Sequence, residues 1–236
     1  MTDTWRHAAR AAATELQAIF GARLRSVVAY GARLDDHSEG PVTCLALVDT
    51  LTVTDLDACA SRAAGWRRAQ IAVPLILRTD EFRESLDAFP LEYGEILHSH
   101  ETVAGEDLLA GVTIAPDDLR RACETQVKSH LLHLREAYME SGANPTAVSD
   151  LVRASAPAFG ALLRNVARLS GVHSSSRMQT TLEGARIAGL PERVVADVLA
   201  LERPAAIPQS DSARLFPEYL AAVEQLARAI NSWRTE

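Results

Sequence analysis

The chain has 236 residues, of which 47% are hydrophobic and 23% are charged, and its formal net charge is −7. This composition is typical of a folded globular protein that is long enough for one large or two modest domains. The negative charge argues against general nucleic-acid binding, and no apolar run reaches the roughly twenty residues of a membrane-spanning helix.

The first half of the sequence predicts a small domain of helices and strands. Apolar residues at helical spacing predict an amphipathic helix over residues 2–20. Two apolar runs, 24–30 and 42–48, flank a polar, turn-rich segment and predict strand, loop and strand. We then expect a helix over 54–68 capped by Thr54, an edge strand over 71–77 that contains Pro74, a helix over 80–88 and a strand over 89–97.

The pattern changes to long helical periodicity near Gly111, so we predict two domains, 1–112 and 113–236. Pro157 predicts a kink in the second long helix, and a helical bundle would bury the apolar stripes. The predicted fold class is therefore α+β, a small mixed-sheet domain followed by an all-α bundle. The helices of the bundle are expected over 116–141, 145–169, 177–188, 191–203 and 213–233.

Three isolated cysteines without CxxC spacing, on a chain without a signal region at its start, predict reduced thiols and a cytoplasmic location. Arginine supplies nearly all of the positive charge, since Lys128 is the only lysine, and alanine is in excess. We interpret this bias as that of a GC-rich bacterial genome.

The order of strand, loop and strand before Asp49 resembles the opening of the nucleotidyltransferase superfamily, which includes polymerase-beta-like and aminoglycoside-modifying enzymes. In that family the first strand ends in Gly-Ser, and the second carries Asp-hydrophobic-Asp, whose carboxylates hold Mg²⁺. Here Gly31-Ala32 replaces Gly-Ser, and Thr43 and Leu45 replace the two aspartates. Leucine cannot bind Mg²⁺. The resemblance therefore implies the fold together with a catalytic motif that is largely lost.

Two further segments extend the resemblance. The family carries a third carboxylate on a neighbouring strand, and Glu92 in the strand expected over 89–97 is its counterpart. Residues 98–109 resemble a connecting segment of the superfamily, in which Gly105, Glu106 and Asp107 match. Residues 119–168, and 124–138 in particular, are similar to the helical half of a widespread bacterial family with this domain order. The resemblance thus covers most of the chain.

Several side chains are candidates for a remodelled site. Asp36, Asp49 and Glu92 are the candidate catalytic carboxylates, and Asp49 and Glu92 are the candidate ligands of Mg²⁺, the cofactor expected if the protein is an active enzyme. The alternative is that the loop carboxylates are solvated turn residues. His98 and His100, with Glu101 or Glu106, could also hold a metal, but they number too few for a zinc site.

Nucleotide binding is expected from Gly31, Ala32 and Arg33 in the first domain. In the family's layout a bundle helix faces the nucleotide, so Lys128, His130 and Arg135 are candidates for contacts with its phosphates. The alternative is a polar helix face, in which Glu124 and Lys128 pair at i and i+4.

Three functions follow from these observations. The first is a catalytically degenerate protein that binds a nucleotide or a protein partner in a cleft between the domains. The second is an active metal-dependent nucleotidyltransferase that uses the shifted carboxylates. The third is a helical interaction module of the toxin and antitoxin kind, because Arg168 and His173 have the loose spacing of the HEPN ribonucleases. Self-association is a further expectation.

Overall fold

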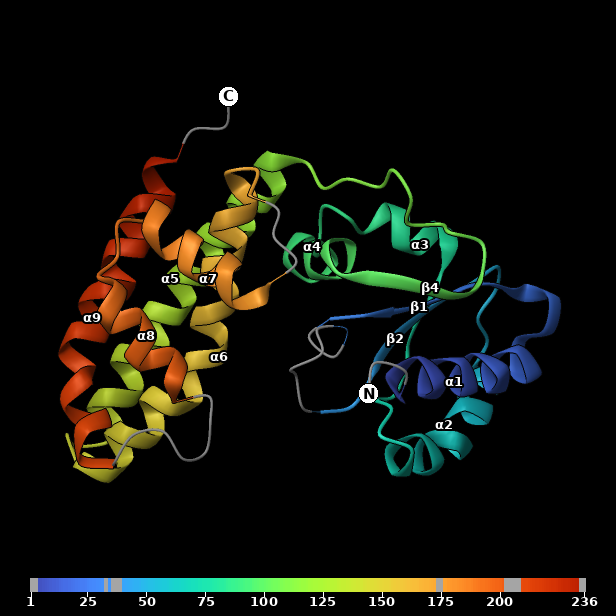
Figure 1. Ribbon diagram of the computed structural model, residues 1–236, viewed down its shortest axis with the longest axis horizontal. Coiled ribbons are helices and arrows are strands. Elements are labelled where there is room, and N and C mark those ends of the chain that lie inside the picture. Colours follow the sequence, from blue (N-terminus) through green and yellow to red (C-terminus); the bar gives the residue numbers. More distant parts are fainter. Residues whose placement is uncertain (1–3, 32–33, 35–39, 173–175, 202–208, 234–236) are drawn as a thin grey trace. The chain divides into compact units, whose positions relative to one another are not determined.

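The computed structural model divides the chain into two compact units, residues 1–114 and 115–236 (Figure 1). It describes residues 4–31, 34, 40–172, 176–201 and 209–233, with the backbone alone for 209–212. In these described segments, no helix is both long enough and apolar enough to cross a membrane.

The N-terminal unit is built on a four-stranded mixed sheet with the strand order β3-β2-β1-β4. The central strand β1 (Leu24–Tyr30) pairs antiparallel with β2 (Thr43–Val48) and with β4 (His100–Gly105), and β3 (Leu75–Arg78) pairs parallel with β2. The first two predicted strands are thus confirmed. The third is an edge strand as predicted, but it begins only after Pro74.

Helices cover both faces of this sheet. Side chains alternate between the faces of a strand, and those of β1 and β2 accordingly divide between two apolar clusters. One cluster includes residues of α1 (Thr4–Phe20) and α2 (Val53–Arg68), and the other includes residues of α3 (Thr79–Glu84) and α4 (Pro90–His98). Figure 1 shows α1 and α2 on one side of the strands and α3 and α4 on the other. Both faces of the two central strands, β1 and β2, are therefore packed in apolar core.

The strand predicted over 89–97 is wrong, because this segment forms α4. Pro90 occupies the first turn, where its missing N–H costs no helical hydrogen bond, and Tyr93 and Ile96 are buried three residues apart. The strand beside β1 is β4, whose residues we had expected in a connecting segment. A smaller correction concerns α2: its N-cap is Thr52, which forms a capping box with Asp55, and not Thr54.

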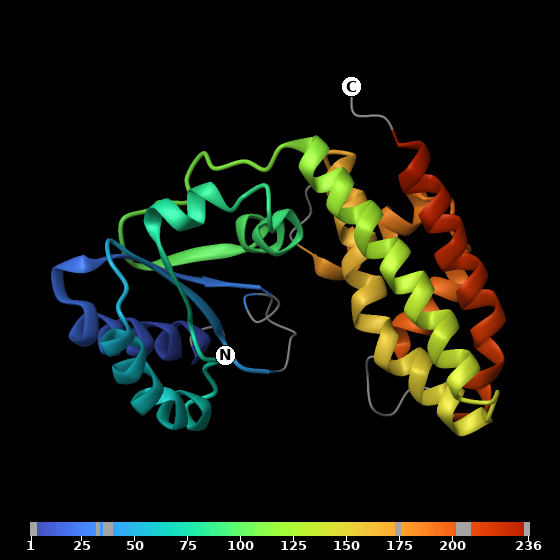
Figure 2. The ribbon, with the colours of Figure 1, turned by 180° about the vertical axis from the view of Figure 1, so that it is seen from behind.

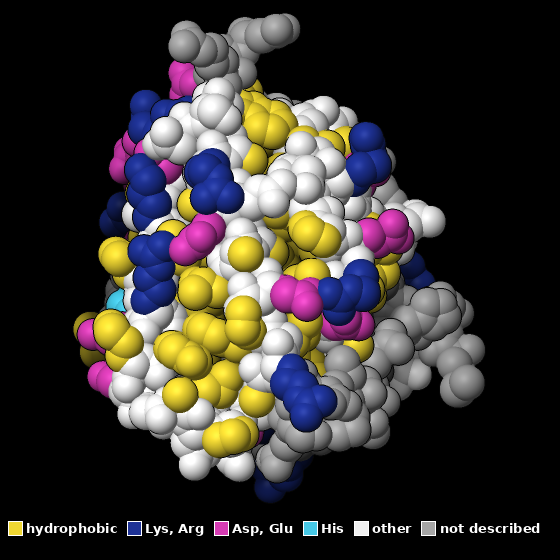
Figure 3. Space-filling model, turned by 90° about the vertical axis from the view of Figure 1, so that its left-hand side faces the viewer, with side chains coloured by type: hydrophobic (Ala, Val, Ile, Leu, Met, Phe, Trp, Pro, Cys, Tyr) yellow, Lys and Arg dark blue, Asp and Glu magenta, His cyan; other side chains and the backbone are white. Residues whose placement is uncertain are grey.

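The C-terminal unit is an all-α bundle, as predicted. Its helices are α5 (Pro116–Glu140), α6 (Pro145–Leu169), α7 (Arg177–Ile187), α8 (Glu192–Ala200) and α9 (Gln209–Ser232), and α6 packs against each of the others (Figure 2). At Gly184, α7 approaches α6 so closely that a Cβ atom would lie 1.8 Å from the carbonyl oxygen of Leu163. On the face of the bundle in Figure 3, hydrophobic side chains lie between charged ones.

Candidate functional site

The end of the sheet where β1 finishes is where the family resemblance places a site. Gly31 has a φ of +85°, and its N–H donates to the carbonyl of Ser99 at 3.0 Å. The hydroxyl of Thr43 donates to the carbonyl of Tyr30. A Cβ atom at Gly31 would lie 3.3 Å from the Thr43 hydroxyl oxygen, so a larger residue would crowd this corner. Ala32 and Arg33 lie outside the described residues.

The face of β2 that carries Thr43 and Leu45 leads into an apolar cluster. Leu45 is completely buried there, in a cluster with Val28, Phe82 and Tyr93. A carboxylate at position 45 would have no water around it and only apolar neighbours in this cluster, which is costly for an ionised group. The hydroxyl of Thr43 is already hydrogen-bonded to the carbonyl of Tyr30. This face therefore presents no free oxygen ligand at positions 43 and 45, where the family has its two metal-binding aspartates.

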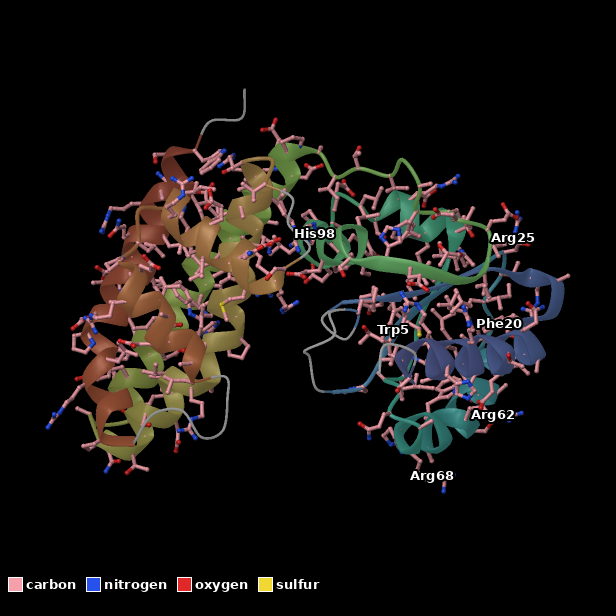
Figure 4. The ribbon with its side chains drawn as sticks, in the orientation of Figure 1. Trp5, Phe20, Arg25, Arg62, Arg68 and His98 are labelled. Carbon is pink, nitrogen blue, oxygen red and sulfur yellow. The ribbon has the colours of Figure 1, made fainter. Side chains whose placement is uncertain are left out.

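Asp49 lies at the other end of β2, directly after Val48. Its N–H donates to the carbonyl of Arg23 at 2.9 Å, and its carboxylate accepts a hydrogen bond of 3.2 Å from Arg25. Since a strand rises about 3.3 Å per residue, six residues separate Asp49 from Thr43 by roughly 20 Å. In Figure 4, Arg25 marks this end of the unit and His98 the opposite one. The structure therefore does not bring Asp49 to the Gly31 end.

Arg25 accounts for the local chemistry around Asp49. Its guanidinium also donates to Glu106 at 2.6 Å, so it links the ends of two strands, β2 and β4. These hydrogen bonds raise the pKa of Arg25, and the one that it donates to Glu106 has the largest effect. The carboxylate of Asp49 thus already has a cation as its partner.

The remaining predicted carboxylates do not complete a metal site. Glu92 is exposed in the first turn of α4 rather than on a strand, and Asp36 lies outside the described residues. In the described part of the chain, no group of three or more His, Cys, Asp or Glu side chains could hold a metal ion. The catalytic roles of these carboxylates stay predictions.

The carboxylate that the sequence analysis did not place on the sheet is Glu101 in β4. It lies opposite Ala29, on the face that α1 covers, and accepts hydrogen bonds of 2.9 and 2.8 Å from Arg6. The hydrogen bond from Arg6 lowers the pKa of Glu101. Gly105 ends this strand. Its backbone lies so close to β1 that a Cβ atom there would be 2.1 Å from the carbonyl oxygen of Arg25.

The histidine pair predicted near a strand divides between two elements. His98 is the last residue of α4, and His100 is the first of β4. The Nδ1 atom of His100 lies 3.1 Å from the carbonyl oxygen of Leu97. Neither histidine belongs to a cluster of metal ligands among the described residues.

The candidate phosphate contacts of the bundle are engaged within it. Lys128 pairs with Glu124, as the alternative interpretation expected, and Arg135 donates to Glu224 at 2.7 Å. His130 Nε2 lies 2.8 Å from the hydroxyl oxygen of the buried Tyr219. Burial lowers the pKa of His130, so at neutral pH its ring is an uncharged partner of this hydroxyl.

The HEPN-like pair is described only in part. The guanidinium of Arg168 donates to the side-chain oxygen of Asn165 at 2.7 Å, within α6. His173 lies outside the described residues, so the spacing of the pair stays a pattern of the sequence.

Comparison with known proteins identifies the architecture. No family model matches the chain, and no curated protein does. Among solved structures, it is similar to the spectinomycin adenyltransferase AAD(9) from Enterococcus faecialis, whose crystal structure contains ATP and spectinomycin. The TM-score is 0.57 at 9% sequence identity, over 94% of this chain and 97% of that one. At this identity the similarity shows the fold alone, and the chain therefore has the nucleotidyltransferase fold.

Proposed function

We propose that this chain is a nucleotidyltransferase-fold protein that binds a nucleotide without transferring it. The observation that carries the proposal is Leu45, which is completely buried in an apolar cluster at a position where the family resemblance calls for a metal-binding aspartate. Attack on a nucleotide's phosphate depends on Mg²⁺ to position the reactants and to neutralise developing charge. A face that carries Thr43 and Leu45 offers that ion no carboxylate.

Binding without a metal requires another source of positive charge or of hydrogen-bond donors. Arg33 follows the Gly31 turn, and its guanidinium could pair with a phosphate in two hydrogen bonds. The N–H of Gly31 already donates to Ser99, so it is not available for a ligand. Support for nucleotide as the ligand comes from the structural neighbour of the same fold, whose crystal structure contains ATP.

A calorimetric titration tests this proposal. The protein is titrated with ATP, GTP, CTP and UTP, each with and without Mg²⁺. We expect at least one nucleotide to bind with an affinity that Mg²⁺ changes little, because the described residues contain no metal clamp. Replacing Arg33→Ala should weaken binding, whereas Arg62→Ala, at an exposed arginine of α2, should not. Binding only with Mg²⁺ would contradict the proposal.

The active-enzyme alternative predicts a different result. Pyrophosphate release that requires Mg²⁺ or Mn²⁺ and collapses on Glu92→Gln would establish a shifted carboxylate set with Asp36, Asp49 and Glu92. Asp49 lies far along β2 from Gly31 and is paired with Arg25, so we expect no release. Failure of all four nucleotides to bind would instead favour a scaffold whose ligand is a protein partner.

A further inference from the structure

The connection between the two units, residues 106–115, is held to the N-terminal unit along most of its length. Leu109 is completely inside the apolar cluster on the α3 and α4 side of the sheet, and its carbonyl accepts a hydrogen bond of 3.1 Å from the N–H of Val112. The other residues of the connection that pack against this cluster are Leu108, Val112 and Ile114. This part of the connection therefore belongs to the N-terminal unit.

Ile114 is the last residue that is anchored in this way. Its Cδ1 atom lies close to α4, where a Cβ atom added to Gly94 would be 4.0 Å away. The next residue, Ala115, is exposed. The boundary between the two compact units falls between Ile114 and Ala115. The point where the chain leaves the first unit is thus defined to one peptide bond.

The second unit begins at once on the other side of this boundary. The carbonyl of Ala115 accepts hydrogen bonds of 3.0 and 3.1 Å from the N–H groups of Asp118 and Leu119, so the peptide between Ala115 and Pro116 is fixed by α5. Rotation of one unit against the other through the connection is therefore confined to a few backbone bonds. They are the Cα–C bond of Ile114 and the two backbone bonds of Ala115.

Pro116 restricts one of these bonds. A proline ring clashes with a helical conformation of the residue before it and holds that residue extended. Ala115 has this extended conformation, with φ −63° and ψ 132°. The proline thus limits rotation about the Cα–C bond of Ala115, and it leaves the N–Cα bond of Ala115 and the Cα–C bond of Ile114 to turn.

We infer that Ala115 is a hinge between the two units and that Pro116 limits its range. Units of one chain that are joined by a short connection reorient by default, unless a large apolar interface holds them. Hinges are a few residues at the ends of elements that absorb the change in φ and ψ. Ala115 has this place, because it lies between an anchored residue and the first turn of a long helix.

Pulsed electron paramagnetic resonance between two spin labels tests the hinge. One label is attached at Arg62→Cys in α2 (Figure 4), and the other at Met139→Cys in α5, and both positions are exposed. The three native cysteines are buried, so the chain without introduced cysteines should take up no label. Met139 lies about 35 Å along α5 from Pro116, since a helix rises about 1.5 Å per residue, so a small rotation moves this label far.

A pair of labels within the bundle, at Met139→Cys and Met178→Cys, gives the width of a rigid reference. In the otherwise unchanged chain, the distance distribution between the two units should be at least about twice as wide as this reference. No ligand is present, so the result is independent of the proposal on nucleotide binding. A distribution between the units as narrow as the reference would overturn the inference.

Two variants should change the width in opposite directions. Pro116→Ala should broaden the distribution between the units by at least about half, because Ala115 can then also become helical. Ala115→Pro should narrow it toward the reference, because a proline ring fixes φ at about −65°. This value is close to the φ that Ala115 already has.

Pro145→Ala is the matched control. Pro145 occupies the first turn of α6 after the extended residue Asn144, as Pro116 does in α5 after Ala115, but this junction joins two helices of the bundle. The control should leave the distribution between the units unchanged. A Pro116→Ala variant with the unchanged width, or a control that broadens it equally, would contradict the hinge. The reference pair and thermal unfolding are measured in each variant, so that loss of the fold is recognised separately.

Discussion

The two units of the molecule differ in how many polar side chains they bury. Among the described residues, Ser26 and Asp55 are the buried polar side chains of the N-terminal unit, whereas the bundle buries a larger polar set. The family resemblance assigns the chemistry of this fold to the sheet, yet its strands β1 and β2 contribute to apolar clusters on both faces. At position 45, where the family resemblance calls for a carboxylate, the sheet contributes a leucine to a hydrophobic core. The buried polar residues of the bundle are Ser149, Arg164, Asn165, Thr180 and Thr181.

Placing a carboxylate in the sheet is the most severe test of its apolar core. Leu45→Asp places an ionisable group in a completely buried apolar position, and we expect it to destabilise the protein by about 4 kcal/mol. Urea unfolding measures the loss. Burial would raise the pKa of the new carboxyl, so the loss should grow as pH rises above about 4. A variant that keeps wild-type stability and binds Mg²⁺ would show that the site is intact.

A second test concerns the close packing of α6 and α7. Gly184→Ala would place a Cβ atom 1.8 Å from the carbonyl oxygen of Leu163, so the helices must separate, at a cost of about 3 kcal/mol. Gly65→Ala in α2 is the matched control, because no atom lies within 4 Å of its added Cβ. The control should stabilise by about 0.5 to 1 kcal/mol. Thermal unfolding distinguishes them, and equal effects would contradict the packing argument.

The polar contact of the N-terminal unit that is most sensitive to acid is the pair of Arg23 and Asp55. The Arg23 guanidinium donates to both carboxylate oxygens at 2.8 Å, and Thr52 adds a further hydrogen bond, which together hold the pKa of Asp55 well below its usual range. The stability that this depressed pKa contributes is present above about pH 4 and is lost as pH falls toward the folded-state value. At pH values below about 4, we expect the urea midpoint of Asp55→Asn to decrease less steeply with falling pH than that of wild type.

The smallest effect is expected in the bundle, at His130. Its pKa is lowered by burial, so the unfolded chain takes up a proton at a higher pH than the folded one does. The stability is therefore present above about pH 6.5 and declines as pH falls below it. The melting temperature of wild type should drop between about pH 7 and pH 5 more than that of His130→Gln. His133→Gln, at an exposed position of the same helix, should keep most of this drop, because burial, ahead of the charge of His133, is the main cause of the lowered pKa of His130.

The sequence predicted the bundle better than the sheet. Each helix of the bundle has an apolar stripe and a clear punctuation signal, such as Pro116 at a first turn or Asn144 as an N-cap, and the structure places the helices close to the predicted ranges. These signals are local, so they can be recognised without knowing what packs where. The central hairpin of β1 and β2 was predicted for the same reason.

The errors concern segments whose structure depends on distant partners. The segment around Glu92 alternates in a way that suits a strand, but Pro90 and the burial of Tyr93 with Ile96 make it a helix against the sheet. Strand β4 is short and half-buried, and it becomes a strand through pairing with β1, about 75 residues earlier. The site was harder still, because the ion pair of Glu101 with Arg6 joins residues 95 positions apart and is not visible in local spacing.

The pairing of β4 with β1 also bears on how the protein is made. The central strand remains open on one side until residue 105 has been synthesised, and the bond between Arg6 and Glu101 then joins the first helix to the last strand of the unit. All elements of this unit precede the bundle in the chain. Since domains generally fold as units from the N-terminus during synthesis, the sheet can close on the ribosome before the bundle emerges. Emergence of β4 from the ribosome is therefore required before the second side of β1 can be paired.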